Sequence, residues 1–352
     1  MKTGIRTPLP NFKRRTRGLW KSGGLLECTN ITAESADVNN YSFKDPDGAG
    51  FQFKPGQHIS IRLPLESGDE YRTFTICSTP TRADEITLTV KTNRPNGATS
   101  WMRDNIKIGS TYSAVGATGL FNLIDYPCEK LLLISAGSGI TPMMSMVRWL
   151  SDRQDDLDVT FIHYAKNSDE YLFSDELSKI TENYMPLTFY QIPTDRADGE
   201  IHGRPSIEQI SSLIDVGDQQ VFCCGPGGFM DAIKDILLKG GLNPDHYHQE
   251  SFGTDIIEDA TSPIDENAEI ITVKFKDKTF KARRGETLLS ALRENKIVVP
   301  TGCKSGMCGT CQMKLINGTV EMNQMGGLSE QQIETGSILA CCSTLTENVS
   351  IL

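Results

Sequence analysis

The sequence predicts a multidomain protein built from an antiparallel β-barrel, an α/β domain with a doubly wound parallel sheet, and a small α+β domain. Short strand-like segments separated by turn signals fill residues 23–126, which is typical of an antiparallel barrel. Strand-like and helical segments then alternate over residues 127–253, as in a parallel sheet covered by helices. Residues 269–352 contain a hairpin-like pair of strands, one helix and a cysteine-rich loop.

Length and composition set the broad class. A chain of 352 residues suggests about two or three domains, and 38% hydrophobic with 23% charged residues is ordinary for a globular protein. No apolar run reaches the ~18 residues of a membrane helix, and the N-terminus lacks the apolar segment of a secretory signal. Ten cysteines, several in a metal-binding pattern, indicate a reducing compartment, so we expect a cytoplasmic protein.

Residues 1–22 form a basic extension with seven lysines and arginines and no acidic residue. Such a short charged segment is commonly solvated. The net charge of the whole chain is −10, so the remaining residues are acidic, which argues against a nucleic acid partner. We expect neither nucleic acid binding nor a membrane span.

The barrel contains a string of residues suited to a flat, phosphorylated ligand. Its predicted strands are rich in Val, Ile and Thr and cover residues 25–28, 57–62, 71–76, 85–92 and 111–115. In the third of these lies Arg72-Thr73-Phe74-Thr75. An arginine can pair with phosphate, an aromatic ring can cover a planar ligand, and a threonine hydroxyl can hydrogen-bond to it. By itself, this string is also compatible with an ordinary edge strand.

The α/β domain opens with a strand, a glycine turn and a helix. The apolar run 131–135 predicts a buried parallel strand, and the turn Ala136–Pro142 leads into a helix over 143–150. This arrangement places a phosphate group at a helix N-terminus. Further strands are expected at 159–164, 187–192 and from 221, with a helix over 175–180. Residues 254–268 are acidic, contain Ser-Pro and are predicted to be a linker.

The small domain is expected to hold an iron–sulfur cluster. Its predicted hairpin covers 269–275 and 279–283, and a helix covers 286–295. Cys303, Cys308 and Cys311 read C-x4-C-x2-C, and Cys341 follows after 29 residues, which is the plant-type [2Fe–2S] spacing. A zinc site would favour a second C-x2-C pair, which is missing. Cys341 is the expected fourth ligand, and the adjacent Cys342 stays open as an alternative.

Taken together, these motifs resemble the ferredoxin–NADP reductase superfamily, followed by a plant-type ferredoxin domain with the β-grasp fold. The similarity covers most of the chain and is carried by segments in the family's order. They are the R-x-Y-S/T flavin motif at Arg72–Thr75 with Phe74 in place of Tyr, the G-x-x-S turn at Gly97–Ser100, the G-x-G-x-x-P turn at Gly137–Pro142, the C-G-P motif at Cys224–Pro226 and the closing E-x-F segment at Glu250–Phe252.

The resemblance implies FAD, a nicotinamide cofactor and a [2Fe–2S] cluster, and it assigns residues to each. The catalytic candidates are Thr75, Cys224 and Glu250. The flavin candidates are His58, Arg72, Thr73, Phe74, Thr75, Val90, Lys91, Gly97, Thr99, Ser100 and Phe252. The nicotinamide candidates are Gly137, Ser138, Gly139, Thr141, Pro142, Cys224, Gly225, Pro226 and Phe229. The cluster ligands are Cys303, Cys308, Cys311 and Cys341.

Charge after the second parallel strand favours NADH over NADPH. A 2′-phosphate is normally bound by arginine, but only Lys166 is available here. Asp169 and Glu170 follow at once and would repel an additional phosphate.

The implied function is electron transfer from NADH to a protein acceptor. NADH delivers two electrons as hydride, whereas a [2Fe–2S] cluster accepts one at a time, and a flavin converts between the two. In the superfamily this domain order occurs in reductases of Rieske-type oxygenases and of hybrid-cluster proteins. Segments 247–253, 318–322 and 338–343 look most similar to a reductase serving an oxygenase of a quaternary amine, whereas 86–90 is equally similar to a hybrid-cluster protein reductase. An electron-transfer subunit that does not oxidise NADH is a further alternative.

Overall fold

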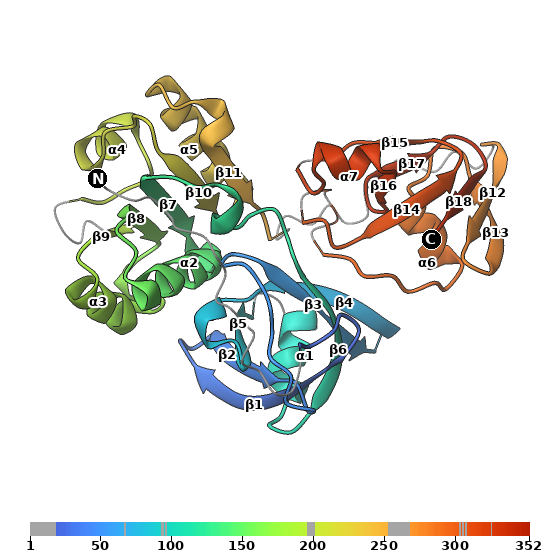
Figure 1. Cartoon of the computed structure of the whole chain (residues 1–352), viewed down its shortest axis with the longest axis horizontal. Coiled ribbons are helices and arrows are strands. Elements are labelled where there is room, and N and C mark those ends of the chain that lie inside the picture. Colours follow the sequence, from blue (N-terminus) through green and yellow to red (C-terminus); the bar gives the residue numbers. More distant parts are fainter. Residues whose placement is uncertain are drawn as a thin grey trace. The chain divides into compact units, whose positions relative to one another are not determined.

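The computed structural model describes residues 19–352 except 67, 93, 94, 96, 196–200, 253–267, 303, 305, 307 and 325. Cys303, nearly all of the predicted linker and most of the predicted N-terminal extension therefore lie outside the described residues. The chain divides into two compact units. Figure 1 labels the helices and strands along the chain. The first unit comprises Met1–Ile59, Phe74–Ala117 and Phe121–Phe252, and the second comprises Ser60–Thr73, Thr118–Leu120 and Gly253–Leu352.

The N-terminal part of the fold is an antiparallel sheet of six strands in the order β4-β3-β6-β1-β2-β5. Strand β1 pairs antiparallel with both β2 and β6, and β2 pairs antiparallel with β5. The prediction of an antiparallel β-barrel domain is confirmed. Its elements are β1 (Leu25–Ala33), β2 (Val38–Lys44), β3 (His58–Leu65), β4 (Gly68–Thr75), β5 (Glu85–Lys91), α1 (Ala98–Asn105) and β6 (Thr111–Thr118), with short 3-10 turns at Pro80–Arg82 and Leu123–Asp125.

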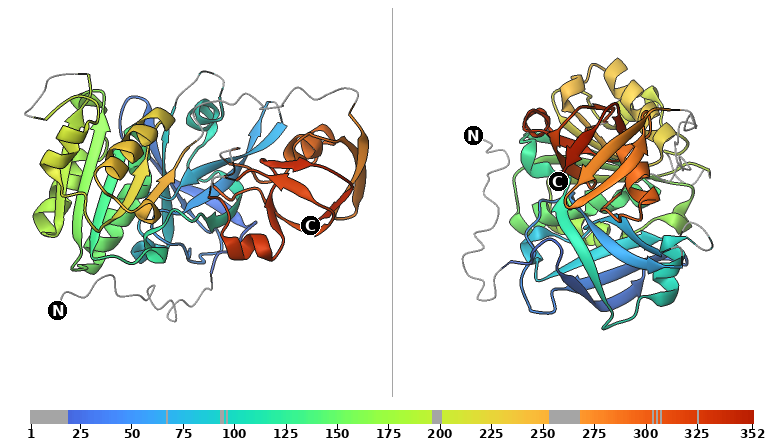
Figure 2. Two further views of the ribbon diagram at one scale, coloured as in Figure 1. Left: turned by 90° about the horizontal axis from the view of Figure 1, so that it is seen from above. Right: turned by 90° about the vertical axis from the view of Figure 1, so that its right-hand side faces the viewer.

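The α/β domain has a five-stranded parallel sheet in the order β11-β10-β7-β8-β9, as predicted. Successive side chains of a strand point to opposite faces, so the apolar strand β7 supplies both cores. Its Leu131 and Leu133 pack with α2 and α3, whereas Leu132 and Ile134 pack with α4 and α5. Figure 1 shows these two pairs of helices on opposite faces of the sheet, and Figure 2 gives two further views.

The elements of the α/β domain follow in βα order. They are β7 (Lys130–Ala136), a 3-10 turn (Gly137–Gly139), α2 (Ile140–Arg153), β8 (Asp158–Ala165), a 3-10 turn (Ser168–Glu170), α3 (Ser174–Asn183), β9 (Leu187–Pro193), α4 (Ile207–Leu213), β10 (Gln220–Cys224), α5 (Gly227–Lys239), a 3-10 turn (Pro244–His246) and β11 (Tyr247–Glu250).

The small C-terminal domain has a mixed sheet in the order β13-β12-β18-β14-β16 and a two-stranded sheet, β15-β17. The expected hairpin and helix are present, and Thr287 caps the helix by accepting a hydrogen bond from the Ser290 N–H (3.3 Å). The elements are β12 (Ile270–Phe275), β13 (Lys278–Arg283), α6 (Leu288–Glu294), β14 (Gln312–Asn317), β15 (Val320–Met322), α7 (Glu330–Glu334), β16 (Ser337–Leu339), β17 (Ser343–Leu345) and β18 (Val349–Ile351). No helix in the described part of the chain is both long and apolar enough to cross a membrane.

Within the first unit, helix α2 is attached to the barrel by hydrogen bonds from its polar side chains. The guanidinium of Arg148 donates to the Cys77 carbonyl (2.6 Å) and to both carboxylate oxygens of Glu176 (2.7 and 2.6 Å). The Ser145 hydroxyl donates to the Ser78 carbonyl (2.8 Å). These bonds join the helix that follows the glycine turn to the chain directly after β4, so they fix the α/β domain on the barrel.

We predict that Arg148→Met lowers the free energy of unfolding of the first unit by about 2–3 kcal/mol, because a buried carbonyl and a carboxylate lose their donor. Arg148 is only 12% exposed. Urea unfolding followed by circular dichroism measures the change. Arg82→Met is the matched control, because Arg82 pairs with Asp152 of the same helix (2.7 Å) but is 64% exposed, and it should change stability by less than about 0.5 kcal/mol. Equal effects of the two substitutions would contradict the prediction.

Candidate functional site

Several predicted site residues meet where strands of the first unit end. Cys224 is the last residue of β10 and Glu250 the last of β11, and the two are partners in the parallel register. His58 begins β3, and its Nδ1 lies 3.2 Å from Glu250 Oε1. The structure thus brings together two residues separated by 192 positions in the chain. Sequence reasoning selected both residues but did not foresee this contact.

Two buried oxygen atoms of the site have no hydrogen-bond partner in the part of the chain that the structure describes. Thr75 Oγ1, at the end of β4, and Glu250 Oε2 are both buried without a hydrogen bond among the described residues. A buried polar atom left in this state costs about 1–3 kcal/mol unless a ligand supplies its partner. A flavin or nicotinamide ring has polar groups along its edge, so both atoms fit a site for such cofactors.

The glycine turn Gly137–Gly139 packs directly against the C-G-P segment. A Cβ on Gly139 would lie 2.1 Å from the Cys224 carbonyl oxygen, so only glycine permits this approach. Gly137 has φ of +54°, and a Cβ there would meet no atom within 4 Å, so the turn is open on that side. The Thr141 hydroxyl donates to the Ser138 carbonyl (3.1 Å) and braces the turn. The two segments predicted to hold the nicotinamide cofactor are therefore in contact.

The Cys224 side chain is a neutral thiol. Burial, followed by the nearby Glu250 carboxylate, raises its pKa well above the usual value for cysteine. A protonated thiol is a poor nucleophile, because the thiolate is the reactive form. Cys224 therefore suits packing against a cofactor ring and does not suit covalent catalysis.

The remaining flavin candidates lie on the barrel, except Phe252, which follows β11 of the parallel sheet. Arg72 pairs with Glu70 (2.6 Å), and Lys91 pairs with Asp37 (3.3 Å) and with Glu170 (3.7 Å). The turn of the predicted G-x-x-S motif does start a helix. Gly97 is the N-cap of α1, and Thr99 and Ser100 lie in its first turn. Thr73 Oγ1 is 2.7 Å from Ser60 Oγ. Val90 is buried, Phe74 is half-buried and Phe252 is 37% exposed.

The nicotinamide candidates after Cys224 surround the start of α5. A Cβ on Gly225 would lie 2.8 Å from the Phe229 ring, and Pro226 is the N-cap of the helix. On the other side of the sheet, Pro142 is buried in the first turn of α2. The starts of α5 and α2 are therefore closely packed. Ser138, in the glycine turn before α2, is half-buried.

The cysteines of the small domain form a hydrogen-bonded group. Cys308 and Cys311 are buried, and the Cys341 N–H donates to Cys311 Sγ (3.4 Å). Hydrogen bonds from the thiols of Cys311 and Cys342 lower the pKa of Cys341 to about 4, and the same contact raises the pKa of Cys311. Thiolates are the form that binds iron, so this chemistry fits a cluster. Cys303 lies outside the described residues, and among those described no group of three His, Cys, Asp or Glu side chains is arranged to hold a metal ion.

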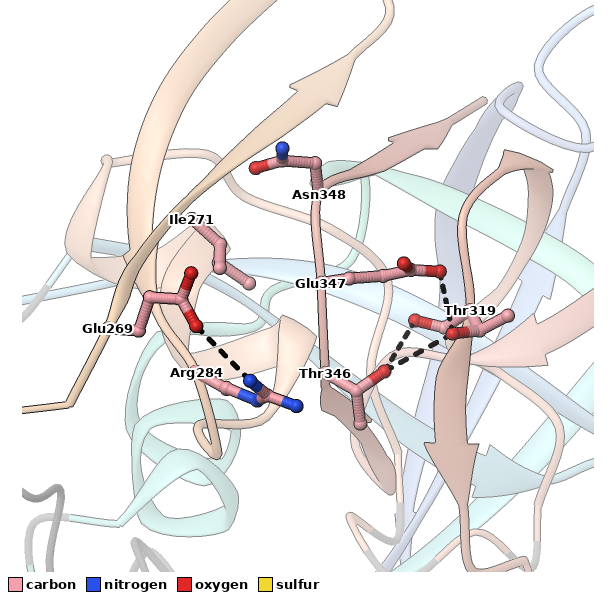
Figure 3. A pocket seen from close by; sticks show the side chains of 7 residues that line it. All are labelled: Glu269, Ile271, Arg284, Thr319, Thr346, Glu347 and Asn348. Atoms are coloured by element: carbon pink, nitrogen blue, oxygen red, sulfur yellow. Dashed lines mark hydrogen bonds and ion pairs between the residues drawn. The ribbon is translucent and has the colours of Figure 1, made fainter.

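A surface cavity of about 380 Å³ lies elsewhere in the small domain (Figure 3). Its polar side chains already bind one another: Arg284 pairs with Glu269 (3.1 Å), and the Thr319 hydroxyl donates to Glu347 (2.7 Å). No predicted site residue lines it. The cavity is lined by Glu269, Ile271, Arg284, Thr319, Thr346, Glu347 and Asn348.

Arg148 is the residue that sequence reasoning missed. It stands in a helix whose other residues from Ile140 to Val147 are all buried, and the Arg148 side chain covers the Phe173 ring at 5.1 Å. An arginine within such an apolar stretch is a recognisable signal, because a charge is rarely buried without a partner.

Three protein-family models match the chain in the order that the fold suggests. The oxidoreductase FAD-binding domain matches residues 26–123, and the oxidoreductase NAD-binding domain matches residues 133–235. The 2Fe-2S iron-sulfur cluster binding domain matches residues 271–346.

Characterised relatives align with nearly the whole chain. The stachydrine N-demethylase reductase subunit of Rhizobium meliloti is 35% identical over 94% of this chain and 97% of its own length. The glycine betaine monooxygenase reductase subunit of Chromohalobacter salexigens is 32% identical (97% and 98%), and the NADH oxidoreductase HCR of Escherichia coli is 31% identical (90% and 93%). Phthalate dioxygenase reductase has the same fold, with a TM-score of 0.60 at 23% identity over 93% of this chain and 97% of that one. The chain therefore belongs to the family of oxidoreductases that serve as reductase components and contain an FAD-binding, an NAD-binding and a 2Fe-2S domain.

Proposed function

We propose that this protein is an NADH-dependent reductase that delivers single electrons to a terminal acceptor protein. The observation that carries the proposal is the meeting of the glycine turn at Gly139, the C-G-P segment and the buried His58–Glu250 pair within one unit. Bound FAD would supply the conversion from hydride to single electrons, and a [2Fe–2S] cluster would pass them on.

The residues of the chain bind and orient the two cofactors. The N–H groups at the start of α2, which follows the turn at Gly137, can donate hydrogen bonds to a phosphate group. Thr75 Oγ1 and Glu250 Oε2 provide hydrogen-bonding atoms for the rings, and their burial excludes water from them. Cys308, Cys311 and Cys341, with Cys303, would hold the cluster.

NADH is the proposed electron donor, in preference to NADPH. Asp169 and Glu170 lie in the turn after β8, where their negative charges would repel the 2′-phosphate of NADPH. Lys91 is 3.7 Å from Glu170 and offsets only part of it, because it also pairs with Asp37. The ratio of kcat/KM for the two nucleotides measures this preference, and a higher kcat/KM with NADPH would contradict it.

The described cysteines are all free thiols, in keeping with our proposal of a cytoplasmic location.

We propose an oxygenase that acts on a quaternary amine as the terminal acceptor. Support comes from the relatives of the stachydrine and glycine betaine systems, at 35% and 32% identity over 94% and 97% of this chain. The Escherichia coli relative, at 31% identity, makes a hybrid-cluster protein the second candidate.

We predict that NADH and catalytic amounts of this protein reduce a purified quaternary-amine oxygenase at least ten times faster than a purified hybrid-cluster protein. Loss of the oxidised acceptor spectrum under anaerobic conditions measures both rates. The reverse order would assign the protein to the second acceptor. Failure to reduce either one would leave both assignments wrong.

Replacing Gly139 is expected to abolish the response to NADH while the flavin stays bound. In Gly139→Ala, the added Cβ would lie 2.1 Å from the Cys224 carbonyl, so the turn must move away from the C-G-P segment. The control is Gly228→Ala, at the start of α5, where a Cβ meets no atom within 4 Å. Flavin content and anaerobic bleaching by NADH measure the outcome. Bleaching at the normal rate in Gly139→Ala would refute the role of this contact.

The fourth cluster ligand is expected to be Cys341. The Cys341 thiol is hydrogen-bonded to the thiol of the predicted ligand Cys311, whereas the Cys342 thiol contacts the Cys341 thiol and the Leu339 carbonyl (3.8 Å). Cys341→Ser should therefore lose most of the iron and sulfide, and Cys342→Ser should keep both. Iron and sulfide analysis of the two purified variants decides between them, and the opposite pattern would make Cys342 the ligand.

A further inference from the structure

The buried contact between His58 and Glu250 uses only one of the two carboxylate oxygens. Both side chains are buried, with 2% and 5% exposure, and His58 Nδ1 is 3.2 Å from Glu250 Oε1. The second carboxylate oxygen, Oε2, is just as inaccessible and has no partner in the described part of the chain. Burial of a carboxylate is unfavourable unless its oxygens are paired, so Oε2 is suited to accept a hydrogen bond from a bound ligand.

Cys224 and His58 lie beside Glu250 in the described part of the chain. Its register partner Cys224 is a neutral thiol, because burial and the carboxylate itself raise the pKa of that cysteine. Among the described residues, the His58 imidazole lies within hydrogen-bonding distance of the Glu250 carboxylate (3.2 Å). The two residues also come from different domains, because β3 belongs to the barrel and β11 to the parallel sheet. The His58 imidazole therefore links the Glu250 carboxylate to the barrel and helps to fix its position.

We propose that His58 is a positioning residue for the hydride step between nicotinamide and flavin. By binding Oε1, it holds Glu250 in one orientation and leaves Oε2 available to accept an N–H group of a bound cofactor. This inference rests on the proposed function, in which Glu250 borders the cofactors. It differs from the expectation that His58 only packs against the flavin, because the effect of His58 is transmitted through Glu250.

The proposal predicts an effect on rate more than on affinity. A misplacement of about 1 Å in a reacting site costs on the order of 10²-fold in rate. In the proposed function, the nucleotide phosphates bind at the Gly137–Gly139 turn, and neither His58 nor Glu250 belongs to that turn. Loss of His58 should therefore slow flavin reduction at saturating NADH and change the Kd for NADH by only a few-fold.

Anaerobic stopped-flow reduction of the holoprotein by NADH tests this proposal. His58→Leu fills similar space but donates no hydrogen bond, and we expect flavin bleaching to be at least ten times slower. His58→Gln keeps a donor and should recover to within about three-fold of the wild-type rate. The matched control is His248→Leu, because His248 also lies on β11, two residues before Glu250, and its Nε2 is 2.7 Å from Gln220 Oε1. We expect this control to bleach within about two-fold of wild type.

A double-mutant cycle separates positioning from packing. If His58 acts through Glu250, His58→Leu should cause no further loss of rate in a Glu250→Ala background. If His58 only packs against the flavin, the two losses should multiply, and the proposal is overturned. Equal rates for His58→Leu and wild type would overturn it as well. If His58→Leu does not retain FAD, the same cycle is run with His58→Gln and Glu250→Ala. Slow bleaching by His58→Gln alone would then show that His58 does not position Glu250.

These outcomes remain distinguishable from failure of the proposed function. Wild-type protein that NADH does not bleach would refute the reductase assignment itself. Wild-type protein that bleaches, together with an unaffected His58→Leu variant, would refute only the role of His58.

Discussion

The hydrogen bond from Arg148 to the Cys77 carbonyl connects the two halves of the first unit. At one end of α2 lies the glycine turn that suits a nucleotide phosphate, and near the other end Arg148 reaches the chain two residues after Thr75. A charged donor bound to a buried carbonyl is favourable only when the geometry is maintained. The relative placement of the two segments that we propose to bind the cofactors therefore depends on this guanidinium and on Glu176, which binds its other nitrogens.

The strand ends then determine which side chains meet. Parallel strands β10 and β11 end together, so Cys224 and Glu250 emerge side by side. Glycine at position 139 allows the turn after β7 to touch the end of β10. Thr75 at the end of β4 and Glu250 at the end of β11 each have a buried oxygen that finds no partner among the described residues, and we propose that bound cofactors supply it.

Local patterns in the sequence were sufficient to predict the main architecture. The apolar run of β7 and the following glycines identified the parallel sheet, and the cysteine spacing identified the small domain. Strand β2 was not predicted, because Asn39, Asn40 and Ser42 interrupt its buried Val38, Tyr41 and Phe43. Helix α4 is only seven residues long, and its one clear signal is the Ser206 cap, which accepts from the Gln209 N–H (3.1 Å). The His58–Glu250 contact joins residues 192 positions apart, so no local pattern could indicate it.

The central claim is that electrons enter from NADH and leave through a [2Fe–2S] cluster in the same chain. Anaerobic titration of the purified protein with NADH, followed by electron paramagnetic resonance, tests this claim most directly. The account predicts that the signal of a reduced [2Fe–2S] cluster grows as the flavin absorbance is lost. A cluster that stays oxidised with excess NADH but is reduced by dithionite would contradict it.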